Sequence, residues 1–208
     1  MADERPQIAV ARTSCTCYPN TPAVPSNAAV NVLNRAHSIT ADVDMPKGGA
    51  DGALLSRGDV QGGYCHYVQG GKLLYVHNHV GMEFMHAESG ILVPTGWHKL
   101  RFGFELTGKS DIAHGKGAPA RGQLDIDGKL VGQGDMPLTM PLTIGLAGGV
   151  VCGAESGSPV RDKFKPLFKF SGKLYGVTMD VTGDLNVVTE PAMNRTDRKS
   201  TRLNSSHG

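Results

Sequence analysis

Short runs of alternating apolar and polar residues, bounded by glycine and proline, constrain the fold of this chain most strongly. In residues 99–106, the apolar Leu100, Phe102 and Phe104 alternate with polar or small neighbours. An apolar residue at every second position places one face of a β-strand in a core and the other in solvent. The 28 glycines and 12 prolines suit many short strands joined by tight turns better than helices.

The same pattern predicts ten strands, and almost every gap between them contains Gly, Pro, Asp or Asn. The predicted strands cover residues 38–44, 52–57, 63–69, 72–78, 83–87, 97–106, 122–126, 129–133, 142–146 and 172–181. Ten short strands with hairpin-length connections indicate an all-β protein, an antiparallel jelly-roll β-sandwich. Only residues 27–34 offer a short helix.

Composition excludes several classes of partner. The chain has 208 residues, enough for one substantial core, and a net charge of +2 without a basic run interleaved with aromatic residues. We therefore expect no nucleic-acid partner. No apolar run reaches the length of about 18 residues that spans a membrane, so we expect no membrane partner. The start, MADERPQIAVARTS, lacks the apolar stretch of a secretory signal. The default location is the cytoplasm, or the periplasm if the true N-terminus is missing.

The stretch GFELTGKS, residues 103–110, fits the nucleotide-binding pattern G-x-x-x-x-G-K-[ST]. That pattern binds phosphate only as a turn between a buried strand and a helix. Here Gly103 falls inside a predicted strand. Glycines and a proline at Gly115, Gly117, Pro119 and Gly122 are too closely spaced for a following helix. We therefore expect a strand running into a polar loop, and no nucleotide.

Two acidic residues resemble a catalytic pair. Asp125 and Asp127 are two positions apart, as paired carboxylates are in β-sandwich glycosidases, but Lys129 stands where a third acid is expected. A calcium loop beginning at Asp125 would need a Glu where Met136 stands. We interpret Asp127–Gly128 as a tight hairpin turn between two strands.

Histidines and cysteines offer weak metal-site candidates. His77 and His79 share one strand face, without an acid or cysteine at a helpful spacing, so we expect polar positions on a solvated face. The same expectation applies to His66, His86 and His98. The four cysteines form no C-x-x-C pair, which predicts neither a zinc site nor a disulfide framework but reduced, mostly buried thiols. They are Cys15, Cys17, Cys65 and Cys152.

Longer segments resemble known folds. GALLSRGDVQGGYCHYVQGGKLLYVHN, followed by GWHKLRFGFEL, LDIDGKLVGQG and FKFSGKLYGVTMDV, resembles the strand sequence of concanavalin A-like and laminin-G-like jelly rolls. The string YPNTPAVPSNAAVNVLNRAHSITADVDMPKGGADGALLSRGDVQGGY resembles more specifically the C-terminal domain of bacterial arylsulfatases. HGKGAPARGQLDIDGKLVGQGDMPLTMP and ESGSPVRDKFK extend this resemblance, which runs from about Thr13 to Val181.

The arylsulfatase resemblance implies a domain organisation. Residues 1–12 would be a linker from a missing upstream domain, residues 13–181 the β-sandwich, and residues 182–208 a disordered tail. Within that tail, residues 197–207 (DRKSTRLNSSH) resemble one reading frame of a sequencing adapter. The chain departs from the family pattern at four positions. Asn20 replaces Gly, Ser26 replaces Glu, His77 stands where Tyr is common, and Glu155 replaces Asp.

The resemblance also implies which chemistry lies elsewhere. Sulfatases, which are sulfuric ester hydrolases, need C-x-P-x-R, whose Cys becomes formylglycine beside a divalent cation, Ca or Mg. No cysteine of this chain begins that motif. We therefore expect no catalytic, cofactor-binding or metal-binding residue here. Our leading hypothesis is a noncatalytic domain that packs on the sulfatase catalytic domain of the same parent chain and shapes access to it.

Two further hypotheses stay open. A free-standing carbohydrate-binding module would stack sugars on aromatic side chains, for which the candidates are Tyr64, Tyr67, Tyr75 and Trp97. The low aromatic content of 6%, mostly at positions compatible with a core, weakens this hypothesis. A glycoside hydrolase would depend on Asp125 and Asp127 for cleavage, and we expect none.

Overall fold

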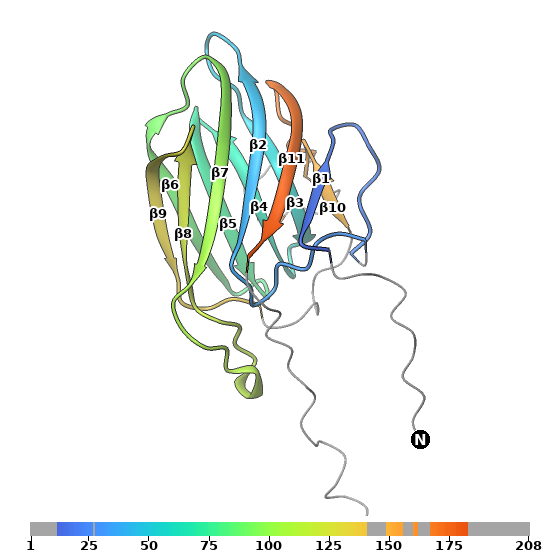
Figure 1. Cartoon of the computed structure of the whole chain (residues 1–208), viewed down its shortest axis with the longest axis vertical. Coiled ribbons are helices and arrows are strands. Elements are labelled where there is room, and N and C mark those ends of the chain that lie inside the picture. Colours follow the sequence, from blue (N-terminus) through green and yellow to red (C-terminus); the bar gives the residue numbers. More distant parts are fainter. Residues whose placement is uncertain (1–11, 27, 141–148, 156–159, 162–166, 183–208) are drawn as a thin grey trace, which may run out of the picture.

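Eleven strands and one short 3-10 helix make up the secondary structure of the residues that the structure describes (Figure 1). The structure is a computed structural model that describes residues 12–26, 28–140, 149–155, 160–161 and 167–182. In chain order, the elements are β1 (Ser14–Cys17), β2 (His37–Met45), β3 (Gly52–Asp59), β4 (Gly62–Gln69), β5 (Lys72–His79), β6 (Glu83–Leu92), β7 (Gly96–Leu106), η1 (Ile112–His114), β8 (Ala120–Ile126), β9 (Lys129–Met136), β10 (Val150–Cys152) and β11 (Lys173–Val181).

The strands form two facing layers joined along one seam. The hydrogen-bonded order is β1-β11-β2-β7-β8-β9-β6-β5-β4-β3-β10, and every neighbouring pair is antiparallel. At the β9–β6 seam, only Ser89 and Gly132 pair in register. We call β1 to β9 in this order the first sheet, and β6 to β10 the second sheet. Figure 1 shows the first sheet in front of the second, with β1 and β10 at the edge opposite the seam.

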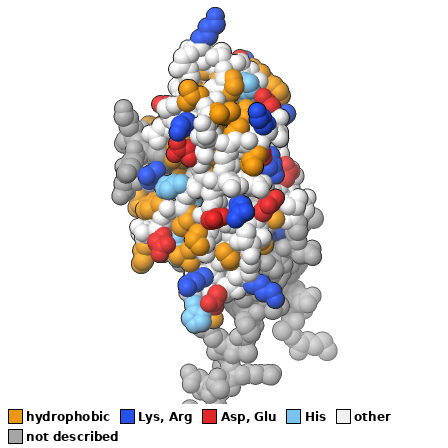
Figure 2. All heavy atoms as spheres, turned by 90° about the vertical axis from the view of Figure 1, so that its left-hand side faces the viewer, with side chains coloured by type: hydrophobic (Ala, Val, Ile, Leu, Met, Phe, Trp, Pro, Cys, Tyr) orange, Lys and Arg blue, Asp and Glu red, His pale blue; other side chains and the backbone are white. Residues whose placement is uncertain are grey.

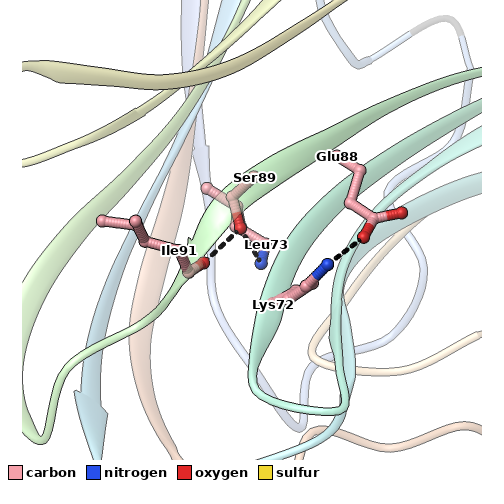
Figure 3. A network of polar contacts seen from close by, with 5 residues as sticks. All are labelled: Lys72, Leu73, Glu88, Ser89 and Ile91. Carbon is pink, nitrogen blue, oxygen red and sulfur yellow. Dashed lines mark hydrogen bonds and ion pairs between the residues drawn. The ribbon is translucent and has the colours of Figure 1, made fainter.

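Ser89 holds the corner where β6 leaves the second sheet (Figure 3). The register of β5 with β6 shifts between Lys72 and Leu74, which interrupts the regular ladder. The buried Ser89 hydroxyl accepts a hydrogen bond from Leu73 N at 3.0 Å and donates one to Ile91 O at 2.7 Å. Lys72 and Glu88 form an ion pair beside it. Backbone groups freed by the irregular register are thereby satisfied by a side chain.

Alternating residues of both sheets fill the space between the layers. Phe102 of β7 stacks on Tyr75 of β5, with ring centroids 3.5 Å apart and planes 6° from parallel. Ile39, Leu100 and Leu124 are fully buried in the same cluster. The predicted period-2 pattern of the first sheet therefore describes a real inner face and a solvated outer face.

The strands β3 and β4 of the second sheet are buried on both faces, so they show no alternation of burial, whereas β6 at the seam alternates between buried and exposed residues. On the outer face of this sheet, Val160 and Phe168 pack against a cluster that includes Tyr67 and Val76. Asn78 Nδ2 donates to Val160 O at 2.9 Å, and Ser56 Oγ donates to Ala154 O at 2.9 Å. The chain that follows β10 thus covers the second sheet.

A close backbone approach at Gly52 holds this covering chain in place. A Cβ atom at Gly52 would lie 2.3 Å from Lys169 O and from Phe170 Cα, and Gly52 has a φ of +129°. Ala53 N donates to Phe168 O at 2.9 Å, and Phe170 N donates to Gly153 O at 3.0 Å. Only glycine fits here, because both the conformation and the space exclude a side chain.

The predicted all-β antiparallel sandwich is confirmed, with particular differences. The strands β2 to β9 and β11 correspond to predicted strands, whereas the short edge strands β1 and β10 were not predicted. The helix predicted at residues 27–34 is wrong, because its described residues, 28–34, form turns and bends. Edge strands of three or four residues carry too little pattern to be recognised. The predicted strand at 142–146 lies outside the described residues, as do most of the predicted linker and tail.

We predict that Gly52→Ala lowers stability much more than Gly49→Ala. Both glycines have positive φ, which costs an L-residue about 1–2 kcal/mol. Gly49 has open space around it, whereas Gly52 faces backbone atoms that no rotamer change can move. Urea unfolding followed by circular dichroism gives the comparison. Equal midpoints for the two variants would show that the approach at Gly52 does not hold the fold.

Candidate functional site

Three of the four predicted sugar-stacking residues lie in the core. Tyr64, Tyr67 and Tyr75 are 2%, 0% and 1% exposed, so they have no accessible ring face on which a sugar could stack. Tyr64 and Tyr75 point between the sheets, where their rings stack at a centroid distance of 6.2 Å. Tyr67 points to the other face of the second sheet and is covered by Phe168. A sheet covered on both faces leaves no surface for these rings.

Trp97 is exposed, and two tyrosines that were not predicted share its face. Trp97, Tyr175 and Tyr18 are 55%, 45% and 57% exposed. Trp97 of β7 is paired with Asp44 of β2, and Asp44 is paired with Lys173 of β11. Tyr175 follows Lys173 by two positions. The side chains of Trp97, Lys173 and Tyr175 therefore lie on the outer face of the first sheet. The ring of Tyr18 lies over the neighbouring Gly176, where a Cβ atom would be 3.4 Å from Cδ1.

Ion pairs occupy the rest of this outer face. Lys99 Nζ lies 2.7 Å from Asp42 Oδ1 and 5.3 Å from the centroid of the Trp97 ring. Arg101 Nη1 lies 2.7 Å from Asp125 Oδ2, directly across the β7–β8 pair. Asp125, which is only 9% exposed, is therefore paired with a cross-strand partner of opposite charge.

Asp127 belongs to a turn, as the sequence predicts. Asp127 and Gly128 have φ values of +51° and +79° and connect Ile126 to Lys129, which are paired. Positive φ at both central residues defines a type I′ hairpin turn. The Asp127 carboxylate accepts from His98 Nδ1 at 2.7 Å and from Lys99 N at 2.8 Å, and these bonds lower its pKa against the effect of partial burial. Asp125 and Asp127 are thus engaged by different partners, Asp125 by Arg101 and Asp127 by His98 and the backbone of Lys99.

The nucleotide-binding pattern also lies in the structural context that the sequence predicts. Gly103 is inside β7, the chain continues as a loop with Lys109 exposed, and η1 consists of three residues only. A helix of that length cannot present the row of N–H groups that a phosphate needs.

Two of the predicted surface histidines are buried, which corrects that expectation. His66 and His77 are 0% and 5% exposed. They face the interior between the sheets, because each lies two positions from a core tyrosine on the same strand, His66 from Tyr64 on β4 and His77 from Tyr75 on β5. Burial lowers the pKa of His66 and of His77 to about 3, and that of the neighbouring His37 to about 4. His79, His86 and His98 are half-buried.

The cysteines are free and mostly buried, as predicted. Burial raises the pKa of Cys152 to about 12, and its Sγ donates to Cys17 O at 3.4 Å. Within the described ranges, no group of three or more His, Cys, Asp or Glu side chains could hold a metal ion. Among the same residues, no helix is long and apolar enough to cross a membrane.

A groove lies at the open edge of the sandwich, beside Tyr18 and Tyr175. We call it the edge groove. Its volume is about 430 Å³, and its lining includes Asn20 and Thr21 after β1, residues 151–154 at β10, and Lys169 and Lys173 before and within β11. Figure 2 shows the opposite edge, at the β9–β6 seam, where hydrophobic, basic and acidic side chains are intermixed. No sequence pattern signals the groove, since the segment after β1 is more than a hundred residues from the other segments that line it.

Local turns position the polar groups of the edge groove. Thr21 Oγ1 donates to Tyr18 O at 2.7 Å and closes the turn after β1. Asn20 has a φ of +60°, a left-handed conformation that Asn tolerates better than most residues. Its Oδ1 accepts from Lys169 Nζ at 3.2 Å. This hydrogen bond joins the turn after β1 to the segment before β11, and both segments line the groove.

Comparison with known proteins identifies the fold but no family. No protein-family model and no curated protein sequence matches the chain. The leech intramolecular trans-sialidase, complexed with 2,7-anhydro-Neu5Ac, superposes with a TM-score of 0.50 at 10% identity, over 83% of this chain and 26% of that chain. The native heptameric SAP-like pentraxin from Limulus polyphemus has a TM-score of 0.43 at 14% identity, over 84% of this chain and 80% of that chain.

The architecture and the likeness to the trans-sialidase define an all-β protein with a concanavalin A-like jelly-roll β-sandwich fold. This chain spans about a quarter of the trans-sialidase chain, 26% of it, so the likeness concerns one part of that enzyme. At 10% identity, it shows the fold alone.

We predict that acid destabilises the protein through its buried histidines. The pKa values of His37, His66 and His77 are about 4, 3 and 3, below the ordinary value of 6.5. Below pH 6.5 the unfolded chain binds protons that the folded chain does not, so stability falls as the pH falls from 6.5 toward 4. Urea unfolding between pH 4.5 and pH 8 measures this slope.

His77→Tyr provides the matched variant, because it removes one buried histidine and keeps an aromatic ring at the same position. The variant removes one histidine and should flatten the slope below pH 6.5 by about one proton equivalent, about 1.4 kcal/mol per pH unit. A change in packing shifts stability at every pH and leaves the slope unchanged. An unaltered slope would show that His77 is not held neutral by the fold.

Proposed function

We propose that this chain is the noncatalytic C-terminal β-sandwich domain of an arylsulfatase, where it packs on the catalytic domain and shapes access to the active site. The observation that carries the proposal is the long collinear resemblance from about Thr13 to Val181. The same span runs from β1 to β11, whose pairing of Ser14 with Asp180 closes one folding unit. A complete unit of this kind is what a separate domain of a larger enzyme requires.

The catalytic chemistry of this proposal belongs to the parent protein. The four cysteines are followed by TCYP, YPNT, HYVQ and GAES, so none begins C-x-P-x-R. The parent catalytic domain would supply the formylglycine and the divalent cation, Ca or Mg. This domain would contribute contacts and an entrance surface rather than reacting groups.

The genomic region upstream of Met1 tests the proposal. We expect an open reading frame that continues in frame and contains C-x-P-x-R. The parent should hydrolyse 4-nitrophenyl sulfate, whereas residues 13–181 alone should not. A stop codon and promoter directly upstream would contradict the proposal.

A second candidate function is carbohydrate binding, and the exposed aromatic residues favour it. Trp97, Tyr175 and Tyr18 lie on one outer face, with charged side chains between them. The strand β2 separates β7 from β11, so Trp97 and Lys173 are about 9–10 Å apart across the sheet. Exposed aromatic rings with a polar surround can contact the apolar face of a sugar while its hydroxyl groups bind polar neighbours.

Calorimetric titration against a panel of neutral glycans measures this function. Trp97→Ala should weaken binding about three- to tenfold, in line with about 0.5–1.5 kcal/mol for an aromatic contact. Met82→Ala is the matched control, because Met82 is 80% exposed but lies at the β5–β6 turn. If no glycan binds at millimolar concentration, this second candidate function is wrong.

A further inference from the structure

A small cavity lies between the two sheets, at the end of the sandwich where β2 and β4 begin. We call it the interlayer cavity. Its volume is about 20 Å³, somewhat more than the roughly 10–15 Å³ that one water molecule needs. Its lining includes His37 from the first sheet, and Tyr64 and His77, which are paired across β4 and β5 of the second sheet. The cavity therefore has room for one water-sized molecule in contact with both sheets.

Three polar atoms in this lining have no hydrogen-bond partner among the residues that the structure describes. They are His37 Nε2, His77 Nδ1 and the Tyr64 hydroxyl oxygen. Each of the three side chains is more than nine-tenths buried. A buried polar group without a partner costs folding free energy, so such groups are usually satisfied by the protein or by an ordered water. The interlayer cavity is therefore a polar site rather than an apolar void.

Backbone hydrogen bonds determine which nitrogen of each histidine carries the proton. His37 Nδ1 donates to Arg35 O at 2.8 Å, so His37 Nε2 has a free lone pair. Met140 N donates to His77 Nε2 at 3.2 Å, so His77 Nδ1 carries the hydrogen. Both rings are neutral at pH 7, because burial lowers their pKa values to about 4 and about 3. The first sheet thus presents an acceptor at the cavity, and the second sheet presents a donor.

The Tyr64 hydroxyl adds a third polar group, which can donate or accept. Burial raises the pKa of Tyr64, and the charge of the nearby Arg57 opposes part of this rise. The hydroxyl therefore keeps its proton at neutral pH and retains both hydrogen-bonding roles.

These roles select the chemistry of a ligand. The donor on His77 and the acceptor on His37 match, yet they form no direct hydrogen bond. A molecule between them must accept from one ring and donate to the other. A metal ion cannot accept from an N–H group, an anion without hydrogen cannot donate, and an ammonium ion cannot accept. Water both donates and accepts, and it fits the volume.

We propose that the interlayer cavity binds one structural water molecule, which accepts from His77 Nδ1, donates to His37 Nε2 and bonds to the Tyr64 hydroxyl. Three bonds are the usual number for a buried water. This water joins the first sheet to the second by hydrogen bonds inside an otherwise mainly apolar core. The inference goes beyond the functions proposed above and does not depend on them.

A high-resolution crystal structure of the full chain at pH 8 tests the assignment directly. We expect one peak of electron density in the cavity, about 2.5–3.2 Å from His37 Nε2, His77 Nδ1 and the Tyr64 hydroxyl oxygen. An empty cavity, or a direct hydrogen bond between the two histidine rings, would overturn the proposal. A peak with anomalous scattering would identify a metal ion instead and would also overturn it.

Nitrogen NMR of the two histidine rings tests the hydrogen-bond roles in solution. At pH 8, both rings should carry their proton on Nδ1, as the bonds to Arg35 O and Met140 N require. Equimolar zinc chloride should leave the signals of both rings unchanged, because His77 Nδ1–H offers no lone pair. A proton on His77 Nε2, or zinc-induced shifts confined to these two rings, would contradict the assigned bridge.

His37→Phe tests whether the water couples the two rings. The variant keeps a ring that can stack on Phe104 but removes the acceptor, so the water loses one partner and holds His77 Nδ1–H less firmly. Hydrogen exchange of this N–H should become about fivefold faster relative to the backbone amides of β5, since a net hydrogen bond contributes about that factor.

Val76→Ala is the matched control, because Val76 lies next to His77 in β5 but faces the other side of the second sheet. It should leave the exchange of the His77 N–H unchanged on the same scale. Equal exchange in the wild type and in His37→Phe would overturn the bridge, as would an equal acceleration in Val76→Ala. Urea unfolding of each variant checks that the fold is retained.

Discussion

The approach of the Lys169–Phe170 backbone to Gly52 is the contact on which most of the molecule depends. It lets the chain after β10 lie against the start of β3, with hydrogen bonds to Ala53 and Gly153 on either side. The covered second sheet can then bury apolar side chains on two faces, which a sheet with one solvated face cannot do. The same contact positions Lys169 and Phe170, which line the edge groove. The stability of the fold and the shape of the groove therefore both depend on the absence of a side chain at Gly52.

The distribution of aromatic residues follows from this arrangement. The large rings that the chain has are used mainly to fill the interior, where Phe102 stacks on Tyr75 and Phe168 covers Tyr67. The exposed tyrosines come from irregular positions instead. Tyr18 directly follows the last residue of β1, and Tyr175 lies at the bulge between Leu174 and Gly176. Irregular strand positions can direct side chains away from the core, which is a common use of bulges near binding sites.

The sequence predicts the first sheet better than the second, for a physical reason. Residues such as Phe102 in β7 alternate with solvated neighbours, and Asp127–Gly128 carries the chemistry of a two-residue hairpin turn. His66 and Tyr67 are neighbours on β4, yet both are buried, one on each face. A prediction from apolar-polar alternation assumes that one face of each strand is exposed to solvent. For this sheet it therefore wrongly places residues such as His66 on an exposed face. Which face is covered depends on distant segments.

The edge groove shows the same limit more strongly. Asn20 and Lys169 meet through a hydrogen bond although 149 residues separate them. Neither residue belongs to a recognisable motif, and one adopts a backbone conformation that a sequence pattern does not reveal.

The pairing of β1 with β11 has a topological consequence. Ser14 lies opposite Asp180, so the two ends of the sandwich leave from neighbouring strands at one edge. A short bridge could join them, and fresh termini could be opened at the β8–β9 turn without breaking any ladder. A circularly permuted form of this sandwich would keep the same eleven-strand order and could be inserted into a surface loop of another protein.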